Sequence, residues 1–520
     1  MRDPAAAVPH RLPRVQTLAG PLGGALLLVG LAGTTARASA KPLWHDEIFT
    51  LYLATLPRVG DLWRALADGV DLNPPLYHLA VRLTVGVLGP TELAVRVPAL
   101  AGFAVACLAL YAFARFRWGA GPALVGAMVP ALTGTYLYAY EGRPYGLVLG
   151  LSAVALLAWQ RREDERWRRA APLVCAATLT AAVWTHYYAV LLVVTLAAGE
   201  LARAIARRRV DVGQWLALAV PLGALAALLP LVSRARTFAA TFWSPPAIGM
   251  LASAYADLVD PLGLVVLALG VGLAAAVVAG RLRPAGPEGA RAVRAVPLAD
   301  VVVLIALVGL PVAGYALAQM VTGAFHERYV IASVLGVAGL SACACATLAR
   351  RPAVLTIVFA VVAAAFAARQ AAGLARLAIP FDPLARDRAL VSRASADLPL
   401  VASHALVFLP LAHYLPPADA QRVAFVARPP EVVRRIGVDT GARALRRLAR
   451  VAPLWVAEYD TFVQAHPRFL VYGPPTWLVT KLLEDGAIVR LVDWHDDRLL
   501  LEVVRPAARQ EQTAASRVQP

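Results

Sequence analysis

Long apolar blocks alternate with short polar segments along most of the chain. Each block holds about 20 residues, which is the length that an α-helix needs to cross the hydrocarbon core of a bilayer. The pattern therefore predicts an α-helical polytopic membrane protein with about eleven transmembrane helices. The predicted spans are 17–37, 96–116, 120–139, 143–160, 170–185, 187–204, 214–232, 261–280, 299–320, 329–348 and 353–372.

Arginines between these blocks indicate how the chain is threaded. The chain has 520 residues, of which 59% are hydrophobic, and its formal net charge is +17. Alternate loops hold most of the arginines, for example at 161–169 and 203–209. By the positive-inside rule these loops are cytoplasmic, so the N-terminus is predicted inside and the C-terminus outside. Because topology accounts for the positive charge, no nucleic-acid partner is predicted.

The first outward loop, 38–95, is long enough to hold structure of its own. Its segment 73–89 is apolar but too short to cross a membrane. Pro74 and Pro75 suit the first turn of a helix, which needs no backbone donors. We predict a helix that lies in the membrane interface.

The composition changes at about residue 376, which ends the predicted transmembrane domain at 1–375. Short apolar runs typical of strands alternate with helical stretches over 376–505, which favours a small α/β domain. The predicted topology places this domain outside the cytoplasm. The polar tail, 506–520, is predicted to be disordered.

Polar residues collect at the ends of spans that are predicted to face outward. Charge beside a membrane is costly and usually functional. Asp46 and Glu47, in "LWHDEIFT", follow the first span directly. The others lie in tight outward turns or near the same level: Glu141, Arg143 and Tyr145; His186, Tyr187 and Tyr188; His326, Glu327, Arg328 and Tyr329; and Arg82 and Arg96.

Carboxylates beside arginines suit the transfer of a sugar from a lipid phosphate. A carboxylate can remove a proton from an attacking hydroxyl, and arginine forks bind phosphate oxygens in two-pronged fashion. No nucleotide is available outside the cytoplasm, so a lipid-linked donor is the sensible energy source.

Each of these residues also has a purely structural interpretation. The acidic pair at 46–47 is typical of a helix start as well. Glu141 and Arg143 can form an ion pair that stabilises their turn. His186 can hydrogen-bond a neighbouring helix, and Arg328 can extend to lipid head groups.

Several segments of the chain resemble a known family. They are "LWHDEIFT" (43–50), "NPPLYHLAVRLTVGVLG" (73–89), "YAYEGRPYG" (138–146) and "WTHYYA" (184–189). They resemble the bacterial polyprenyl-phosphate-sugar glycosyltransferases of the GT-C superfamily, a branch similar to glycosyltransferase family 39 that includes protein O-mannosyltransferases and aminoarabinose transferases. The resemblance covers about 40–205 and continues through "HERY" (326–329).

The resemblance implies an inverting membrane enzyme of GT-C type. His78 departs from the family pattern, because an aromatic residue is expected there, and this leaves the acceptor open. The implied roles are catalysis for Asp46, with Glu47 as its supporting partner; donor phosphate and sugar binding for Glu141, Arg143, His186 and Arg328; and a place beside the acceptor for Asn73 and Tyr77.

We therefore predict a hexosyltransferase of the bacterial plasma membrane. It moves a hexose, with mannose as the candidate, from a polyprenyl-phosphate sugar to a hydroxyl of an extracytoplasmic protein, lipid or glycan, and Asp46 acts as the base. No cofactor is predicted. No divalent metal is predicted either, because a site at Asp46 and Glu47 would need oxygen ligands from several other segments.

Two other hypotheses stay open. A transporter or flippase for lipid-linked sugars would also need charges at the outer face, together with polar residues along a path through the membrane. A non-catalytic envelope assembly protein would use the C-terminal domain for binding, and Asp46 would then be dispensable.

Overall fold

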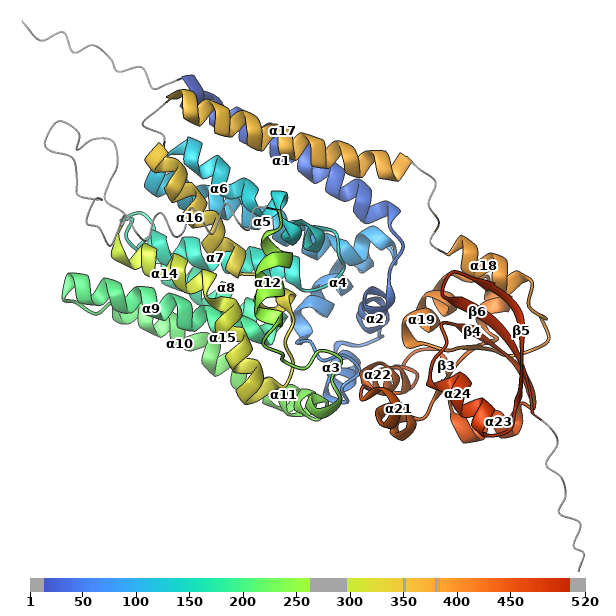
Figure 1. Cartoon of the computed structure of the whole chain (residues 1–520). Helices are drawn as coiled ribbons and strands as arrows, with labels where there is room; N and C mark the ends of the chain where they lie inside the picture. The colour runs from blue at the N-terminus through green and yellow to red at the C-terminus, as the bar shows by residue number, and fades with distance from the viewer. Residues whose placement is uncertain (1–13, 262–296, 349–351, 379–381, 383, 506–520) are drawn as a thin grey trace, which may run out of the picture.

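The computed structural model describes residues 14–261, 297–348, 352–378, 382 and 384–505. A helical bundle and a smaller domain that contains a sheet lie end to end (Figure 1). Helices α1 (Arg14–Ala40) and α17 (Pro352–Ala378) lie side by side along one flank of the bundle. The predicted fold class, a polytopic helical protein with a C-terminal α/β domain, is confirmed.

Apolar helices make up the bundle, and short helical turns connect several of them. Besides α1, α17 and the helices of the first long loop, they are α5 (Glu92–Trp118), α6 (Ala120–Leu132), α7 (Tyr145–Arg161), α8 (Ala170–Thr185), α9 (Val190–Arg207), α10 (Val212–Ala226), α11 (Leu229–Arg236), α12 (Met250–Val259), α14 (Leu298–Val308), α15 (Leu310–Leu317) and α16 (Ser333–Leu348). The short helical turns are η1 (Gly134–Ala139), η2 (Tyr187–Ala189), η3 (Ala239–Thr241), η4 (Ala318–Thr322) and η5 (Glu327–Val330).

Ten of the predicted spans coincide with described helices, and 261–280 lies almost wholly outside the described residues. Four of the described helices are long and apolar enough to cross a membrane by themselves. Two bent pairs, α10 with α11 (61°) and α14 with Leu310–Thr322 (53°), raise this number to six if each pair is one span. The other predicted spans fall on shorter apolar helices such as α7 and α8, so the count of eleven stays a prediction.

The first long loop is folded into three helices, α2 (His45–Ala54), α3 (Val59–Ala67) and α4 (Pro75–Leu88). Helix α4 occupies the segment where an interfacial helix is predicted, and it begins at Pro75 as the two prolines suggest. Arg82 of α4 donates hydrogen bonds to backbone carbonyls at 54–57. This contact ties α4 to the end of α2 and so steadies the helix that carries Asp46.

Helices α5 and α7 approach each other so closely that glycine is required between them. A Cβ on Gly150 of α7 would lie 2.3 Å from the carbonyl oxygen of Gly102 in α5. A Cβ on Gly102 would in turn lie 2.4 Å from the Cα of Leu147. Small residues at a helix crossing let two backbones meet inside a membrane. The crossing fixes α7, whose N-terminus follows the turn that contains Arg143.

Buried ion pairs tie the helices at the end of the bundle away from the C-terminal domain. Arg117 donates from Nε to Oδ2 of Asp300 (2.6 Å) and from Nη2 to Oε2 of Glu163 (2.7 Å). Arg203 donates from Nη1 to Oε2 of Glu200 (2.8 Å). Each carboxylate of this cluster faces an arginine, and Nε of Arg203 also lies 3.3 Å from Oε1 of Glu163, so ion pairs join α5, α9 and α14.

The C-terminal domain is an open six-stranded sheet with helices on both faces, and its strand order is β3-β2-β1-β4-β6-β5. The first four strands of that order are parallel, and β6 and β5 are antiparallel to their neighbours. The strands fall within 376–505, where the short apolar runs predict them: β1 (Leu400–Ala402), β2 (Val423–Ala427), β3 (Trp455–Glu458), β4 (Arg468–Gly473), β5 (Ile488–His495) and β6 (Arg498–Val504).

The helices of this domain connect the strands and join the domain to the bundle. Helix α17 ends at Ala378, close to 376, and the division of the chain there stays a prediction. Helix α19 packs against α2. The helices are α18 (Ala385–Ser392), α19 (Ala405–Tyr414), α20 (Pro417–Ala420), α21 (Pro429–Ile436), α22 (Thr440–Leu448), α23 (Tyr459–Ala465) and α24 (Trp477–Glu484).

We expect Gly150→Ala to lower the free energy of unfolding by about 1–3 kcal/mol, because the added methyl group meets backbone atoms that cannot move aside. Gly86→Ala is the matched control, since Gly86 lies in α4 and a Cβ there would meet nothing within 4 Å. At that position alanine should stabilise the helix by about 1 kcal/mol. Thermal unfolding of the two purified variants checks both signs. Unfolding of Gly150→Ala at the wild-type temperature would contradict the close crossing.

Candidate functional site

A cavity of about 840 Å³ lies where the bundle meets the C-terminal domain. This volume is in the range of ordinary ligand sites. One side, here called the bundle wall, carries Asp46, Arg143, His186 and Arg328. The opposite side, here called the domain wall, is built from residues within 403–477 of the C-terminal domain. The polar turns that the sequence places at one membrane face therefore converge on one cavity.

Asp46 is the carboxylate of the bundle wall that is most open to the cavity. It lies in the first turn of α2, and its side chain is 27% exposed. Its nearest cationic partner is Nε of Arg143, 3.8 Å from Oδ2. Its backbone carbonyl accepts from Nη1 of Arg143 (3.2 Å) and from the hydroxyl of Thr50 (3.0 Å). The carboxylate is thus held in place through its backbone while its oxygens stay accessible.

Glu47 is the next residue, but its side chain points into the protein. It is fully buried and accepts from Arg96 at Oε1 (2.8 Å, Nε) and Oε2 (2.5 Å, Nη2). The backbone N–H groups of Gly142 (2.5 Å) and Trp44 (3.1 Å) also donate to it. Glu47 does not line the cavity, so any support that it gives to Asp46 acts through the position of α2.

Arg143 lies between Asp46 and a second aspartate, Asp71. Its Nη1 lies 3.4 Å from Oδ2 of Asp71, and its Nε has no hydrogen-bond partner within the described part of the chain. Asp71 also accepts from the side chain of Asn73 (2.8 Å) and lies 3.5 Å from Nε2 of His78. Burial raises the pKa of Asp71, but Arg143 and His78 more than offset this, so its pKa lies below its usual range. Asp71 is therefore an ionised and fully engaged carboxylate.

Arg328 has no carboxylate within ion-pair distance among the residues that the structure describes. Its guanidinium lies 5.4 Å from the ring centre of Tyr145 and 5.3 Å from that of Trp243. Its Nε is buried and lacks a hydrogen-bond partner in the described residues. A guanidinium held between two aromatic rings, with unused donors at a cavity, is suited to receive an anion.

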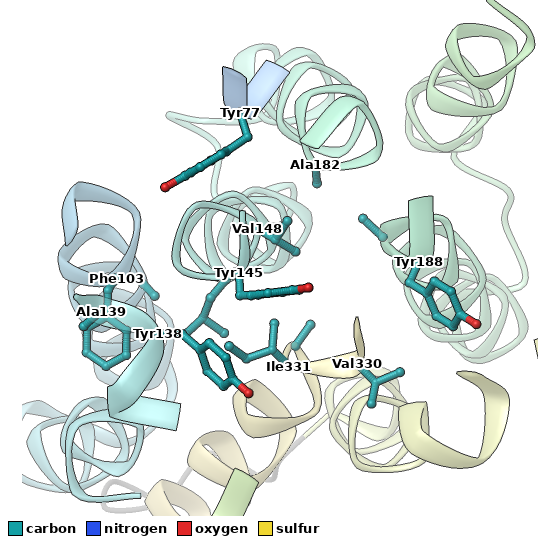
Figure 2. Close-up of a cluster of buried hydrophobic side chains, with 14 of the residues drawn as sticks. Tyr77, Phe103, Tyr138, Ala139, Tyr145, Val148, Ala182, Tyr188, Val330 and Ile331 are labelled. Carbon is teal, nitrogen blue, oxygen red and sulfur yellow. The ribbon is translucent and has the colours of Figure 1, made fainter. Parts of the chain in front are cut away.

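His186 and the tyrosines at 145, 187, 188 and 329 line the bundle side of the cavity. In Figure 2, Tyr145 lies at the centre of the group and its hydroxyl points to the side where Tyr188 lies. The ring of His186 lies 5.0 Å from that of Tyr329 and 5.6 Å from that of Tyr145. Burial, together with Arg143 and Arg328, lowers the pKa of His186 to about 3. A neutral imidazole here offers hydrogen bonds and carries no charge.

Three other predicted site residues occupy different positions. Asn73 lines the cavity, next to Asp71. Tyr77 is buried in the bundle, donates to the carbonyl of Val95 (3.2 Å) and does not line the cavity. Glu141 is also buried outside the lining, and its carbonyl accepts from the N–H of Arg143 (2.7 Å), which closes the turn. Burial raises the pKa of the Glu141 carboxyl, although Arg328 opposes the effect.

Several residues of the site are absent from the sequence-based prediction. Asp71 lies two residues before Asn73, in the polar stretch "DLNPP", so an aspartate ahead of the proline pair was the available signal. His45 precedes Asp46 in α2, and Trp243 follows η3. The whole domain wall was also missed, because nothing local in 403–477 indicates that it faces the bundle.

No group of three or more His, Cys, Asp or Glu side chains that could hold a metal ion occurs in the described ranges. Asp71 and Asp439 are engaged by arginine, asparagine or hydroxyl groups, and Asp46 is paired with Arg143 only at 3.8 Å. The charged partners offered to a phosphate by this site are guanidinium groups.

Comparison with known proteins agrees with this fold. Residues 72–233 match the family described as dolichyl-phosphate-mannose-protein mannosyltransferase. ArnT from Cupriavidus metallidurans bound to undecaprenyl phosphate has a TM-score of 0.56 at 12% identity, over 94% of this chain and 98% of that chain. The apo state of the same protein gives 0.54 at 13% identity, over 94% and 98%. The archaeal oligosaccharyltransferase AglB from Archaeoglobus fulgidus, in complex with an inhibitory peptide and a dolichol-phosphate, gives 0.43 at 11%, over 87% and 70%.

Among curated proteins, none matches the chain. The family match over 72–233 and the likeness of nearly the whole chain to the fold of ArnT agree with the resemblance found in the sequence.

We expect Glu47→Gln to lower the free energy of unfolding by about 3–5 kcal/mol, because it leaves Arg96 buried without its charge partner. Asp46→Asn is the matched control at the adjacent position. Its carboxylate is partly exposed and only distantly paired, so we expect a change of less than about 1 kcal/mol. Thermal unfolding of both variants in the same lipid nanodiscs measures the difference. Equal destabilisation would contradict the assignment of Glu47 to the protein interior and Asp46 to the cavity.

Proposed function

Since residues 72–233 match a family of membrane mannosyltransferases and the chain has the GT-C fold, we propose that it is a hexosyltransferase with a polyprenyl-phosphate sugar as donor. Mannose is the candidate sugar, and the acceptor is a hydroxyl outside the cytoplasm. The proposed setting is the bacterial plasma membrane, with the cavity at the outer face and the N-terminus inside. The arginine distribution of the loops supports this orientation.

The observation that carries the proposal is that one wall of the cavity holds an accessible carboxylate together with guanidinium groups whose hydrogen-bond donors are not all used. Asp46 keeps its carboxylate oxygens open to the cavity. Arg143 and Arg328 each have a buried Nε without a hydrogen-bond partner among the described residues. A base for a hydroxyl and cations for a phosphate are the two requirements of transfer from a lipid phosphate.

The reaction that fits these groups is a single displacement at the anomeric carbon. Asp46 takes the proton of the acceptor hydroxyl, and the acceptor oxygen forms a bond to C1 of the sugar. The bond from C1 to the phosphate oxygen breaks, and its electron pair leaves with the polyprenyl phosphate. Arg143 and Arg328 stabilise the charge that develops on that phosphate. One displacement inverts the anomeric configuration.

ArnT has been solved with undecaprenyl phosphate, and this supports a polyprenyl carrier for the present chain. His186 and Tyr145 lie beside the two arginines, where the donor sugar would be held. Asn73 orients Asp71, which in turn positions Arg143. We propose that Glu141, by closing the turn before Arg143, contributes to the donor site indirectly.

The transporter hypothesis is less well supported. It needs polar groups along a path between the two ends of the bundle. The polar cluster at the far end, with Arg117, Glu163 and Asp300, consists of mutually satisfied ion pairs. A non-catalytic role leaves no reason for an open carboxylate beside the arginines.

We expect Asp46→Asn to lower sugar transfer by about 100- to 10,000-fold, because the general base is lost. The assay incubates the full-length protein in nanodiscs with radiolabelled polyprenyl-phosphate mannose and a native membrane extract. Asp61→Asn is the matched control, since Asp61 lies in the same loop but pairs with Arg64 outside the cavity. Equal transfer by wild type and Asp46→Asn would overturn the assignment of the base.

Arg328→Gln tests the donor site separately. We expect it to weaken the binding of undecaprenyl phosphate by about 10- to 100-fold, because charge-assisted hydrogen bonds to the phosphate are lost. Arg64→Gln, at an exposed arginine outside the cavity, is the control. Unchanged binding by Arg328→Gln would remove the phosphate role from this residue.

We also propose that guanidinium groups take the place of a divalent metal ion. Transfer should then continue at the wild-type rate in the presence of EDTA, since Arg143 and Arg328 already supply positive charge. The measurement compares initial rates with EDTA alone and with EDTA plus excess Mg²⁺ or Mn²⁺. Loss of activity in EDTA that the added metal restores would contradict a metal-independent site.

A further inference from the structure

The domain wall of the cavity lies at the point where the strand order of the sheet reverses. Strand β1 has β2 on one side and β4 on the other, and the connections from β1 and β4 leave the sheet in opposite directions. In open α/β sheets, ligands bind in the crevice at the carboxyl ends of two such strands. Here the residues that follow β1 are Ser403 and His404, and those that follow β4 include Thr476. All three line the cavity that also contains Asp46.

This crevice adjoins the proposed base. Helix α2, which carries His45 and Asp46, packs against α19, whose first residue is Ala405, and all three residues line the cavity. A molecule that occupies the crevice would therefore lie beside Asp46. The bundle wall with Arg143 and Arg328 faces it from the other side of the cavity.

Neutral hydrogen-bonding groups line the crevice. Nδ1 of His404 accepts from the N–H of Leu406 (3.2 Å), which leaves Nε2 as a donor. The hydroxyls of Ser403 and Thr476 donate to backbone carbonyls. The Thr476 hydroxyl also accepts from the N–H of Leu478 (3.4 Å), so it keeps one lone pair for a ligand, and the Ser403 hydroxyl can accept as well. This mixture of donor and acceptor groups suits the hydroxyls of a ligand, since each hydroxyl both donates and accepts.

The domain wall offers no free charge to a ligand. None of its described lining residues is a lysine or an arginine. Its one carboxylate, Asp439, accepts from the hydroxyl of Thr241 (2.6 Å) and is buried. Burial lowers the pKa of His404, so this imidazole is neutral at physiological pH. The cations of the cavity lie on the bundle wall, and a ligand held by the domain wall is therefore a neutral molecule.

Two large apolar side chains extend from the domain wall at the edge of the cavity. Leu406 in the first turn of α19 is 52% exposed, and Ile436 at the end of α21 is 57% exposed, although both line the cavity. Trp243 and Val321 of the bundle also line the cavity and are exposed. Apolar surface that stays open beside a polar crevice matches a ligand with a polar head and an apolar chain.

We propose that this switch-point crevice is the acceptor subsite and that it takes a neutral glycolipid, whose sugar hydroxyls meet Ser403, His404 and Thr476 while its apolar chain lies along Leu406 and Ile436. The inference rests on the proposed transferase function. It adds the class of acceptor and assigns the C-terminal domain a part in binding it. The anionic donor phosphate would then lie at the arginines of the bundle wall and the neutral acceptor at the uncharged groups of the domain wall, with Asp46 between them.

The test uses an alkyl β-glucoside that carries a diazirine in its alkyl chain. The full-length protein in phosphatidylcholine nanodiscs is irradiated with this probe, and the labelled segments are mapped by mass spectrometry. We expect label on the segments around Leu406 and Ile436, and competition by decyl β-glucoside but not by decanol. Leu406→Asp should reduce the labelling about tenfold, because the apolar contact is lost. Leu483→Asp, at a residue of α24 that is 55% exposed and outside the cavity, should leave it unchanged.

Equal labelling of wild type and Leu406→Asp, or equal competition by decanol, would overturn the subsite. Labelling of the same segments by a photoreactive serine-containing peptide and not by the glucoside would overturn it in favour of a protein acceptor. Photoreactive undecaprenyl phosphate, applied to the same proteins, reports on the donor site and on folding. It should label wild type and Leu406→Asp alike. Labelling of wild type by the glucoside but not by undecaprenyl phosphate would support the subsite and overturn the proposed donor.

Discussion

The buried ion pair between Glu47 and Arg96 is the constraint on which the site depends. Glu47 accepts from Arg96, from the N–H of Gly142 and from the N–H of Trp44. Arg96 donates its remaining hydrogens to backbone carbonyls at 38–42, where the chain leaves α1. One pair of charges thus joins the end of α1, the start of α2, helix α5 and the turn before α7. A fully buried pair is tolerated only when every polar atom is satisfied, as it is here.

Two residues of the bundle wall, Asp46 and Arg143, owe their positions to this pair. The turn that it holds at Gly142 continues directly to Arg143, and the helix start that it caps carries Asp46. Arg143 then reaches both Asp46 and Asp71, so three segments far apart in the sequence share one guanidinium. The cost of burying these charges is offset by their mutual contacts, and the exception is Arg328, which meets aromatic rings and no carboxylate within the described chain.

Much of the fold could be predicted from the sequence because its signals are local. Apolar runs of helical length located the bundle helices, and short apolar runs indicated strands in the C-terminal domain. The convergence of polar residues at one end of the bundle was also visible, since alternate loops of a threaded chain return to the same side. The distinct positions of Asp46 and Glu47 could not be predicted. Adjacent residues on a helix point about 100° apart, and only the packing of α2 decides which one faces the cavity.

The other parts of the site that the sequence did not predict, Asp71 and the domain wall, owe their positions to contacts between distant segments. Asp71 lies in a loop without periodicity, and its importance comes from Arg143, which is distant in the sequence. The domain wall depends on how the C-terminal domain docks onto the bundle, and the docking contacts join segments that lie far apart in the sequence. The N–H of Leu43 donates to the hydroxyl of Tyr414 (2.7 Å), which itself donates to Glu92 (3.0 Å). Such pairings leave no periodic pattern in either segment.

The docking also explains why the position of Asp46, the proposed base, depends on both domains. Helix α2 is fixed on one side by Glu47 to α5, and on the other side α19 of the C-terminal domain packs against it. His45 and Leu43 contact α19, and Asp46 lies in the same helical turn as His45. A shift of the C-terminal domain would therefore move the carboxylate relative to Arg143, whose own position is set by the bundle. The domain consequently does more than close the cavity, because the distance between the Asp46 carboxylate, which is the proposed base, and the Arg143 guanidinium depends on the contact of the domain with α2.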